Sequence, residues 1–193
     1  AWKRLAETLG FSIDEKFNEN LKGVSRTVCL DLILQHGGIE KTQAEKDVLA
    51  AQKNTWFLEY VKNEITPANV YPGVIDFLSD LKAHGYRTAM GSASKNAPLL
   101  IEKLGIESYF EAIVDGNMIT KAKPNPEVFL KGAELIGVEP QHCVVFEDAK
   151  SGVEAAKNGG MYCIGVGSPK NLPQADFCIS NFTQMSIARF AEL

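Results

Sequence analysis

The sequence predicts an α/β protein in two unlike parts: a small helical bundle, followed by a Rossmann-like parallel sheet with helices on both faces. Two observations support this prediction. Over residues 1–65, apolar residues recur at helical spacing and no segment has the pattern of a strand. Beyond Thr66-Pro67, short apolar runs alternate with helical segments, which is typical of parallel strands covered on both faces. We therefore expect a helical domain over residues 1–65 and an α/β domain over residues 66–193.

Three helices account for the first part. They are expected over residues 2–9, 25–36 and 42–63. The first two are followed by glycines, Gly10 and Gly37, which are common just beyond the last turn of a helix. The third begins after Thr42, whose hydroxyl suits the residue that caps a helix N-terminus.

The second part alternates helices with strands. Helices are expected over residues 73–83, 97–104, 126–136 and 152–158. Strands are expected over residues 88–93, 112–114, 143–146, 163–166 and 177–179. In parallel sheets of this kind, ligands bind beyond the carboxyl ends of the strands, where helix N-termini offer unpaired N–H groups. We therefore expect the functional residues at these strand ends.

The composition excludes several classes of protein. With 45% hydrophobic and 23% charged residues among 193, the chain has the make-up of an ordinary globular domain. Its 20 basic and 24 acidic residues give a net charge of -4 without a basic stripe, so no nucleic-acid partner is expected. No apolar run approaches the roughly 18 residues of a membrane span. The four cysteines form no Cys-x-x-Cys pair, which favours free thiols and a cytoplasmic location.

Two of the strand ends carry groups that suit a phosphate. Residues 91–96 lead from a strand through hydroxyls, a cation and an amide into a helix. Backbone N–H groups, Ser92 and the helix dipole together could bind an anion; the alternative is a serine helix cap beside an exposed lysine. In the second segment, Pro124 and Pro126 stiffen a loop that follows Lys123. That loop could hold the lysine at the sheet edge, or the lysine could simply be solvated.

The third strand end carries two adjacent carboxylates. Glu147 and Asp148 follow an apolar strand and precede a helix. Mg²⁺ prefers hard oxygen ligands and often takes only one or two carboxylates together with phosphate and water. The alternative interpretation is a pair of acids that stabilise the helix N-terminus.

The three segments in combination resemble the haloacid-dehalogenase superfamily. The matches are Ser92, Lys123-Pro124 and Glu147-Asp148, in this order at the strand and loop ends of one domain. The resemblance implies Mg²⁺-dependent phosphoryl transfer. By this resemblance, Ser92 and Lys123 neutralise charge on the transferring phosphoryl group, and Glu147 and Asp148 hold the metal ion. It also implies that the helical part is a cap on a haloacid-dehalogenase-like core.

A narrower resemblance is to the β-phosphoglucomutases of this superfamily, carried by residues 21–26 and 91–96. These enzymes interconvert β-glucose 1-phosphate and glucose 6-phosphate through β-glucose 1,6-bisphosphate, which requires two phosphate sites. The resemblance implies a catalytic site at Ser92, Ala93 and Lys123. The substrate-binding residues that it implies beyond this are Arg26, Lys53, Ser94, Lys95 and Asn96. Without the family, Arg26 would be interpreted as part of a surface ion pair.

One required part of the resemblance does not occur in the sequence. The superfamily's nucleophile is an aspartate in an Asp-x-Asp motif, and no such motif is present in these 193 residues. We expect it on an N-terminal strand that lies between those of Ser92 and Glu147-Asp148, and we expect the chain without it to be inactive. The partners expected are small sugar phosphates, with the protein a monomer. A sugar-phosphate phosphatase and a non-catalytic phosphosugar-binding protein are the alternatives.

Overall fold

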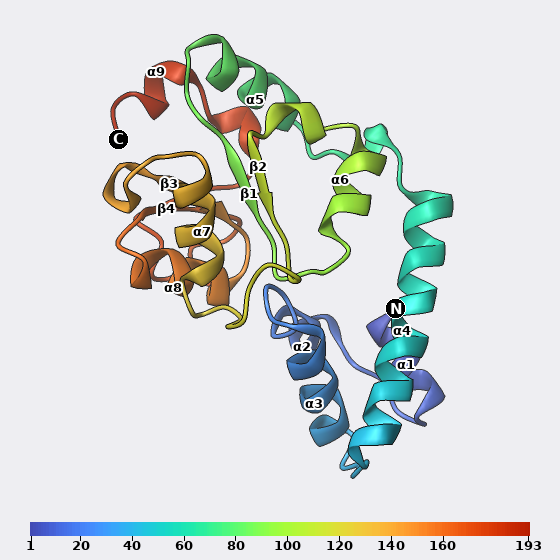
Figure 1. Cartoon of the computed structure of the whole chain (residues 1–193). Coiled ribbons are helices and arrows are strands. Elements are labelled where there is room, and N and C mark those ends of the chain that lie inside the picture. Colours follow the sequence, from blue (N-terminus) through green and yellow to red (C-terminus); the bar gives the residue numbers. More distant parts are fainter.

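The computed structural model describes all 193 residues, with helices alone in the first part of the chain and strands with helices in the second. Figure 1 shows the two parts at opposite ends of the molecule. The helices of the first part are α1 (Trp2–Thr8), α2 (Glu15–Glu19), α3 (Arg26–His36) and α4 (Gln43–Glu64). The short helix α2 was not expected. It begins where the Asp14 carboxylate accepts a hydrogen bond of 2.7 Å from the N–H of Phe17.

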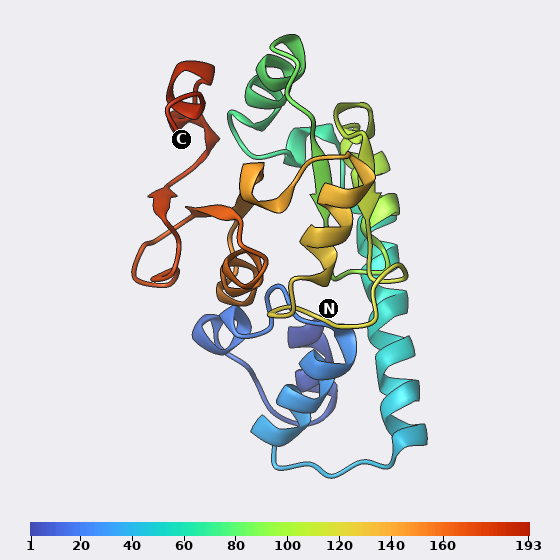
Figure 2. The same ribbon diagram turned by 60° about the vertical axis from the view of Figure 1, so that its left-hand side comes forward.

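The helical region, residues 1–64, has its own apolar interior. The fully buried residues include Leu5 and Ala6 of α1 and Ile33 of α3. Ala6 and Ile33 belong to one apolar cluster, and Leu5 belongs to a second one. Thr42 caps α4 as predicted, because its side chain accepts from the N–H of Glu45. The long helix α4 runs along one side of this region and reaches α6 of the second part (Figure 2).

The α/β region contains every strand that the sequence predicts. Its strands are β1 (Ala89–Gly91), β2 (Ala112–Val114), β3 (Val144–Glu147), β4 (Tyr162–Val166) and β5 (Phe177–Ile179). Its α-helices are α5 (Val74–Ala83), α6 (Ala97–Leu104), α7 (Glu127–Leu135), α8 (Lys150–Asn158) and α9 (Ile187–Phe190). Short 3-10 helices occupy Pro67–Asn69, Glu107–Tyr109, Pro140–His142 and Phe182–Gln184. Helix α9 was not expected, and α8 begins two residues earlier than predicted.

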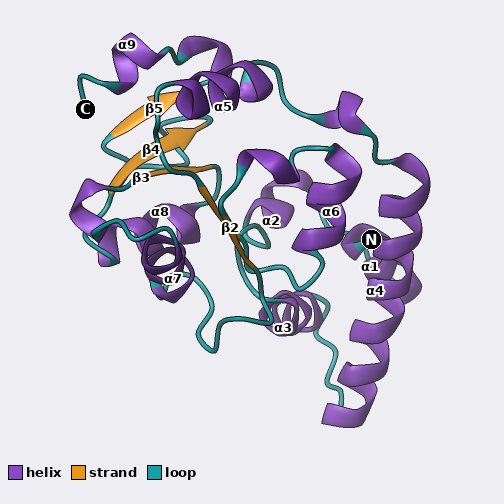
Figure 3. Cartoon of the chain, turned by 45° about the horizontal axis from the view of Figure 1, so that its top comes forward, coloured by secondary structure: helices purple, strands orange, loops and turns teal.

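The strands pair in parallel, but in two groups rather than one sheet. β1 pairs with β2, and β3, β4 and β5 form the second group in that order (Figure 3). The break falls between β1 and β3, which is the position where the superfamily resemblance expects another strand. Each of these two strands therefore has one edge without a partner.

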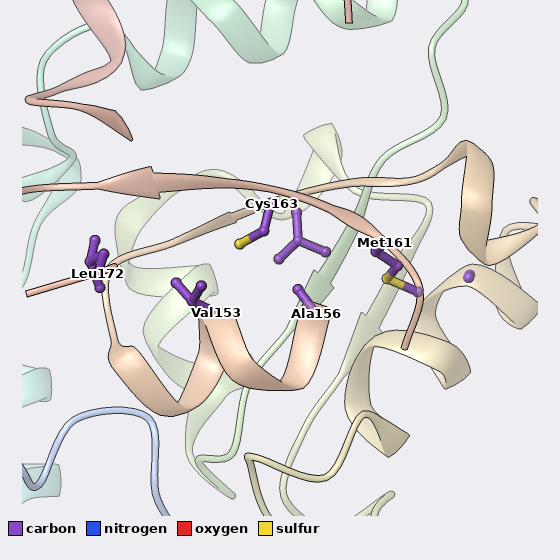
Figure 4. Close-up of a cluster of buried hydrophobic side chains, with 7 residues drawn as sticks. Val153, Ala156, Met161, Cys163 and Leu172 are labelled. Atoms are coloured by element: carbon purple, nitrogen blue, oxygen red, sulfur yellow. The ribbon is translucent and has the colours of Figure 1, made fainter. Parts of the chain in front are cut away.

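Helix α7 connects the two groups of strands. It packs against β1 and β2 and also contacts α8, which covers β3 and β4. The main apolar cluster lies between α8 and the strands β3 and β4 (Figure 4) and includes Val153, Ala156, Met161, Cys163 and Leu172. None of the four cysteines forms a disulfide. No helix combines the length and the apolar character that crossing a membrane requires.

Candidate active site

One cleft, with a volume of about 1450 Å³, extends from the space between β1 and β3 to the helical region. Its walls bring together all the site residues that the sequence predicts, from both parts of the chain. They are Arg26, Lys53, Ser92, Ala93, Ser94, Lys95, Asn96, Lys123, Glu147 and Asp148.

The loop that follows β1 is held by its own serine hydroxyls. The Ser92 Oγ accepts from the N–H of Ser94 at 3.1 Å, and the Ser94 Oγ accepts from the N–H of Asn96 at 3.2 Å. The residue at the N-cap position of α6 is Asn96, whose own side chain accepts no hydrogen bond from the first turn. The alternative of a serine helix cap is therefore wrong. The hydroxyls shape the loop instead, and Ser94 and Lys95 are exposed at the cleft.

Lys123 is buried rather than solvated, so that alternative is also wrong. Its ammonium group pairs with the Glu147 carboxylate and lies 4.5 Å from the ring centroid of Phe129. A buried lysine is tolerated only when its charge is paired or hydrogen-bonded. The pair with Glu147 thus fixes a cation at the end of β3, where the cleft begins.

The two adjacent carboxylates have different surroundings. Glu147 is buried, and its second oxygen accepts from the N–H of Ala149 at 3.0 Å. Asp148 exposes its carboxylate at the cleft, and partial burial together with the charge of Glu147 raises the pKa of Asp148. The cap residue of α8 is Ala149, so neither acid occupies the N-cap position.

This donor set fits a magnesium ion. Asp148 is a hard oxygen donor exposed at the cleft, and Glu147 is a second oxygen donor whose charge Lys123 already compensates. No cluster of three or more histidines, cysteines and acids is present. Two carboxylates are enough for Mg²⁺, because phosphate and water complete its coordination.

The helical region contributes two cations that have no acidic partner. Arg26 forms no ion pair, so the alternative of a surface ion pair is wrong, and partial burial lowers its pKa. Lys53 lies between two aromatic rings, with its Nζ 4.4 Å from the centroid of Trp2 and 4.8 Å from that of Phe57. Burial and the charge of Arg26 lower the pKa of Lys53 to about 8. Uncompensated cations at the wall of a cleft favour binding of an anion there.

Contacts beside the cleft join the helical and the α/β parts, and sequence reasoning did not identify them. The Nζ of Lys22 is 4.0 Å from the Asp148 carboxylate, and the Lys22 carbonyl accepts from the Ser151 hydroxyl at 3.3 Å. Burial lowers the pKa of Lys22, but a hydrogen bond to Glu19 and the charge of Asp148 outweigh it, so the pKa is raised. No spacing rule links residue 22 with residue 148, so only the folded chain could reveal this contact.

A second contact between the two parts was also missed. The Asn96 side-chain amide donates to the side-chain oxygen (Oδ1) of Asn54 at 2.8 Å and thereby connects α4 with the start of α6. The sequence contains no signal for this pair either, since the two residues are 42 positions apart in the chain.

The comparisons with known proteins agree with this architecture. The model of the family described as haloacid dehalogenase-like hydrolase matches residues 1–160. The chain belongs to this family. The haloacid-dehalogenase resemblance and the α/β fold class predicted from the sequence are thus confirmed.

Relatives within the haloacid dehalogenase-like family include a mutase and phosphatases. The chain is 36% identical to a β-phosphoglucomutase of Bacillus subtilis, over 97% of this chain and 83% of that protein. It is 30% identical to a phosphorylated carbohydrates phosphatase of Thermotoga maritima, over 83% of this chain and 73% of that protein. A crystal structure of β-phosphoglucomutase from Clostridium difficile superimposes with a TM-score of 0.93 at 36% identity, covering 99% of this chain and 86% of that one.

Proposed function

We propose that the protein is a Mg²⁺-dependent phosphotransferase that interconverts β-glucose 1-phosphate and glucose 6-phosphate through β-glucose 1,6-bisphosphate. The observation that carries this proposal is the presence of cations on both sides of one cleft. Lys123 lies at the strand side, and Arg26 and Lys53 lie at the helical side. Hydrolysis of a single phosphate requires only the cation on the strand side, whereas a bisphosphate that reacts at either end requires cations on both sides.

The strand side would hold the phosphoryl group that is transferred. The Ser92 hydroxyl and the backbone N–H of Ala93 would donate to its oxygens, and the Lys123 ammonium would neutralise charge that develops on them. Mg²⁺ bound by Asp148, with Glu147 in support, would supply further positive charge at this group.

The helical side would hold the other phosphate. Arg26 presents a planar fork of donors that matches two phosphate oxygens. Ser94, Lys95 and Asn96 would contact the same phosphate from the α/β side. Residues 1–65 would then act as a cap domain over a core of residues 66–193, and closing the cap would exclude water that otherwise hydrolyses the intermediate.

The nucleophile and the acid/base group are proposed to lie on a further strand, outside these 193 residues, in the break between β1 and β3. Support comes from the unpaired edges of β1 and β3, which would each gain a parallel neighbour. The cleft at this point is lined by aromatic side chains that would pack on such a strand. They are Phe77, Tyr86, Phe146, Phe182 and Phe190. An Asp-x-Asp motif at the carboxyl end of the strand would lie beside Ser92 and Asp148, and the 193 residues alone would turn over nothing.

The test compares two substitutions in the full-length protein. Lys123→Ala should lower both mutase activity and hydrolysis of p-nitrophenyl phosphate by several orders of magnitude. Arg26→Ala should lower mutase activity at least tenfold and leave that hydrolysis nearly unchanged, because the small substrate has no second phosphate. Arg4→Ala is the matched control, since Arg4 stacks on Trp56 and lies outside the cleft. Equal losses of hydrolysis in the Lys123 and Arg26 variants would contradict the assignment.

A sugar-phosphate phosphatase is the second candidate, and the phosphatases among the relatives favour it. In that case the unmutated protein would release inorganic phosphate from sugar monophosphates without forming the isomeric product. A full-length protein that binds glucose 1,6-bisphosphate but turns over neither substrate would instead be a phosphosugar-binding protein.

A further inference from the structure

The loop that follows β2 lies directly against the loop that follows β1, and nothing above assigns it a role. It consists of Asp115, Gly116 and Asn117. We propose that these three are positioning residues, which hold residues 94–96 in the shape that binds the second phosphate and so set the preference for bisphosphates over small monophosphates. This inference rests on the proposed function.

Asp115 fixes the loop from inside. Its side chain is buried, and it forms no ion pair with a lysine or arginine. One carboxylate oxygen accepts from the backbone N–H of Asn117 at 2.8 Å, and the other accepts from the Asn117 side-chain amide at 3.1 Å. A buried carboxylate is costly unless it is hydrogen-bonded. Both bonds go to one residue, so the backbone and the side chain of Asn117 are held together.

Asn117 and Gly116 also form hydrogen bonds to the loop that follows β1. The Asn117 amide also donates to the carbonyl of Lys95 at 3.3 Å, and the backbone N–H of Gly116 donates to the carbonyl of Ser94 at 3.2 Å. Two successive carbonyls of the β1 loop are thus anchored by two successive residues of the β2 loop. The anchored residues are ones that the proposed function assigns to the second phosphate.

The close approach of the two loops requires glycine at position 116. A Cβ atom there would lie 2.5 Å from the carbonyl oxygen of Ala93 and 3.0 Å from the backbone nitrogen of Lys95. Both are backbone atoms, which cannot move aside as the end of a flexible side chain can. Any larger residue would therefore push the β1 loop out of position.

A loop that is already in its binding shape loses less conformational entropy when the ligand arrives. Lys95 is exposed and has a flexible side chain, so the position of its backbone sets where its ammonium group can reach. Loosening the β2 loop should therefore weaken binding of the second phosphate. It should spare Lys123 and the carboxylates of β3, which belong to other segments.

The test uses Asn117→Ala in the full-length protein, because Asn117 is exposed and its replacement should leave the fold intact. The KM for β-glucose 1-phosphate in the mutase assay should rise five- to tenfold, and kcat for hydrolysis of p-nitrophenyl phosphate should stay within twofold. Gly116→Ala should act in the same direction. Asn181→Ala is the matched control, because the Asn181 side chain also restrains a loop by a hydrogen bond, which it accepts from the N–H of Thr183 at 3.0 Å, but it lies outside the cleft.

Calorimetric binding separates this inference from the proposed function. Asn117→Ala should weaken binding of glucose 1,6-bisphosphate at least fivefold and change that of inorganic phosphate less than twofold. An unchanged bisphosphate affinity with a lower melting temperature would overturn the inference, since the loop would then be merely structural. Equal losses for both ligands would also overturn it. If the unmutated protein bound the bisphosphate but lacked mutase activity, the proposed function would fail while the binding comparison still decided the role of Asn117.

Discussion

Removing the ammonium group of Lys123 should destabilise the protein severely, and the structure sets the size of the effect. Lys123 is 6% exposed and its partner Glu147 is 9% exposed. Lys123→Met keeps most of the stem and removes the charge, which leaves the Glu147 carboxylate buried with a single hydrogen bond from the N–H of Ala149. Breaking one side of a buried ion pair costs about 3–5 kcal/mol, because the remaining charge is uncompensated. In a chain of this size each kcal/mol lowers Tm by roughly 2–4 °C, so Tm should fall by roughly 6–20 °C.

Urea unfolding of the Lys123→Met variant measures this loss directly and needs no activity. A second variant, Lys123→Met combined with Glu147→Gln, removes both charges and should recover most of the lost free energy of unfolding. Lys46→Met is the control, because it breaks the exposed ion pair of Lys46 with Asp31, at 2.6 Å, and should cost at most about 1 kcal/mol. The reasoning is refuted if Lys123→Met unfolds within about 1 kcal/mol of the unmutated protein, or if the double variant is no more stable than the single one.

Four further predictions concern three side chains, Lys53, Lys22 and Thr42. Binding of glucose 1,6-bisphosphate should weaken as pH rises through about 8, because Lys53 then loses its charge, and calorimetry of Lys53→Met should show no such step. Lys53→Met should also be more stable than the unmutated protein below pH 8. The difference in free energy of unfolding between the two proteins should shrink between about pH 8 and 10.5, because the unfolded lysine there still holds the proton that the folded one has released. A difference that does not change with pH would contradict this. Lys22→Met should raise Mg²⁺ affinity two- to fivefold by calorimetry, since a cation 4.0 Å from Asp148 repels the metal ion; an unchanged affinity would show that Lys22 does not act on the metal ligand. Thr42→Ala removes the cap of α4 and should cost about 1 kcal/mol in urea unfolding, and no measurable loss would refute the role of the cap.

Local patterns were enough to predict most of the elements. The apolar runs that form β2 and β5 match the expected strands to the residue, and the helix predicted over residues 97–104 is α6. The two strands are continuous apolar runs, and α6 is long enough for its helical periodicity to be visible without tertiary information. Helices α2 and α9 contain only five and four residues. Little more than one helical turn contains no repeat to detect, so both were missed.

The positions of Ser92, Glu147 and Asp148 at strand ends were also predictable, but the surroundings of the candidate residues were not. From the sequence, Lys123 could be held at the sheet edge or be solvated; only the fold places the Glu147 carboxylate beside it. The loop of Asp115, Gly116 and Asn117 follows a predicted strand in the same way as the three segments that were considered. The strand-end reasoning would have found it, although not its hydrogen bonds to the carbonyls of Ser94 and Lys95.

The sequence by itself determined the division into a helical and an α/β part, the order of the elements and the chemical groups at the strand ends. These features depend on periodicity, on helix caps and on motifs within a few residues of each other. Only the tertiary structure decided which groups of the two parts come together: Lys22 lies beside Asp148, and Arg26 and Lys53 line the same cleft as Lys123. It also decided that the strands stand in two groups with free edges at β1 and β3. Contacts between residues far apart in the chain depend on how whole elements pack, and short-range sequence patterns contain no information on that packing.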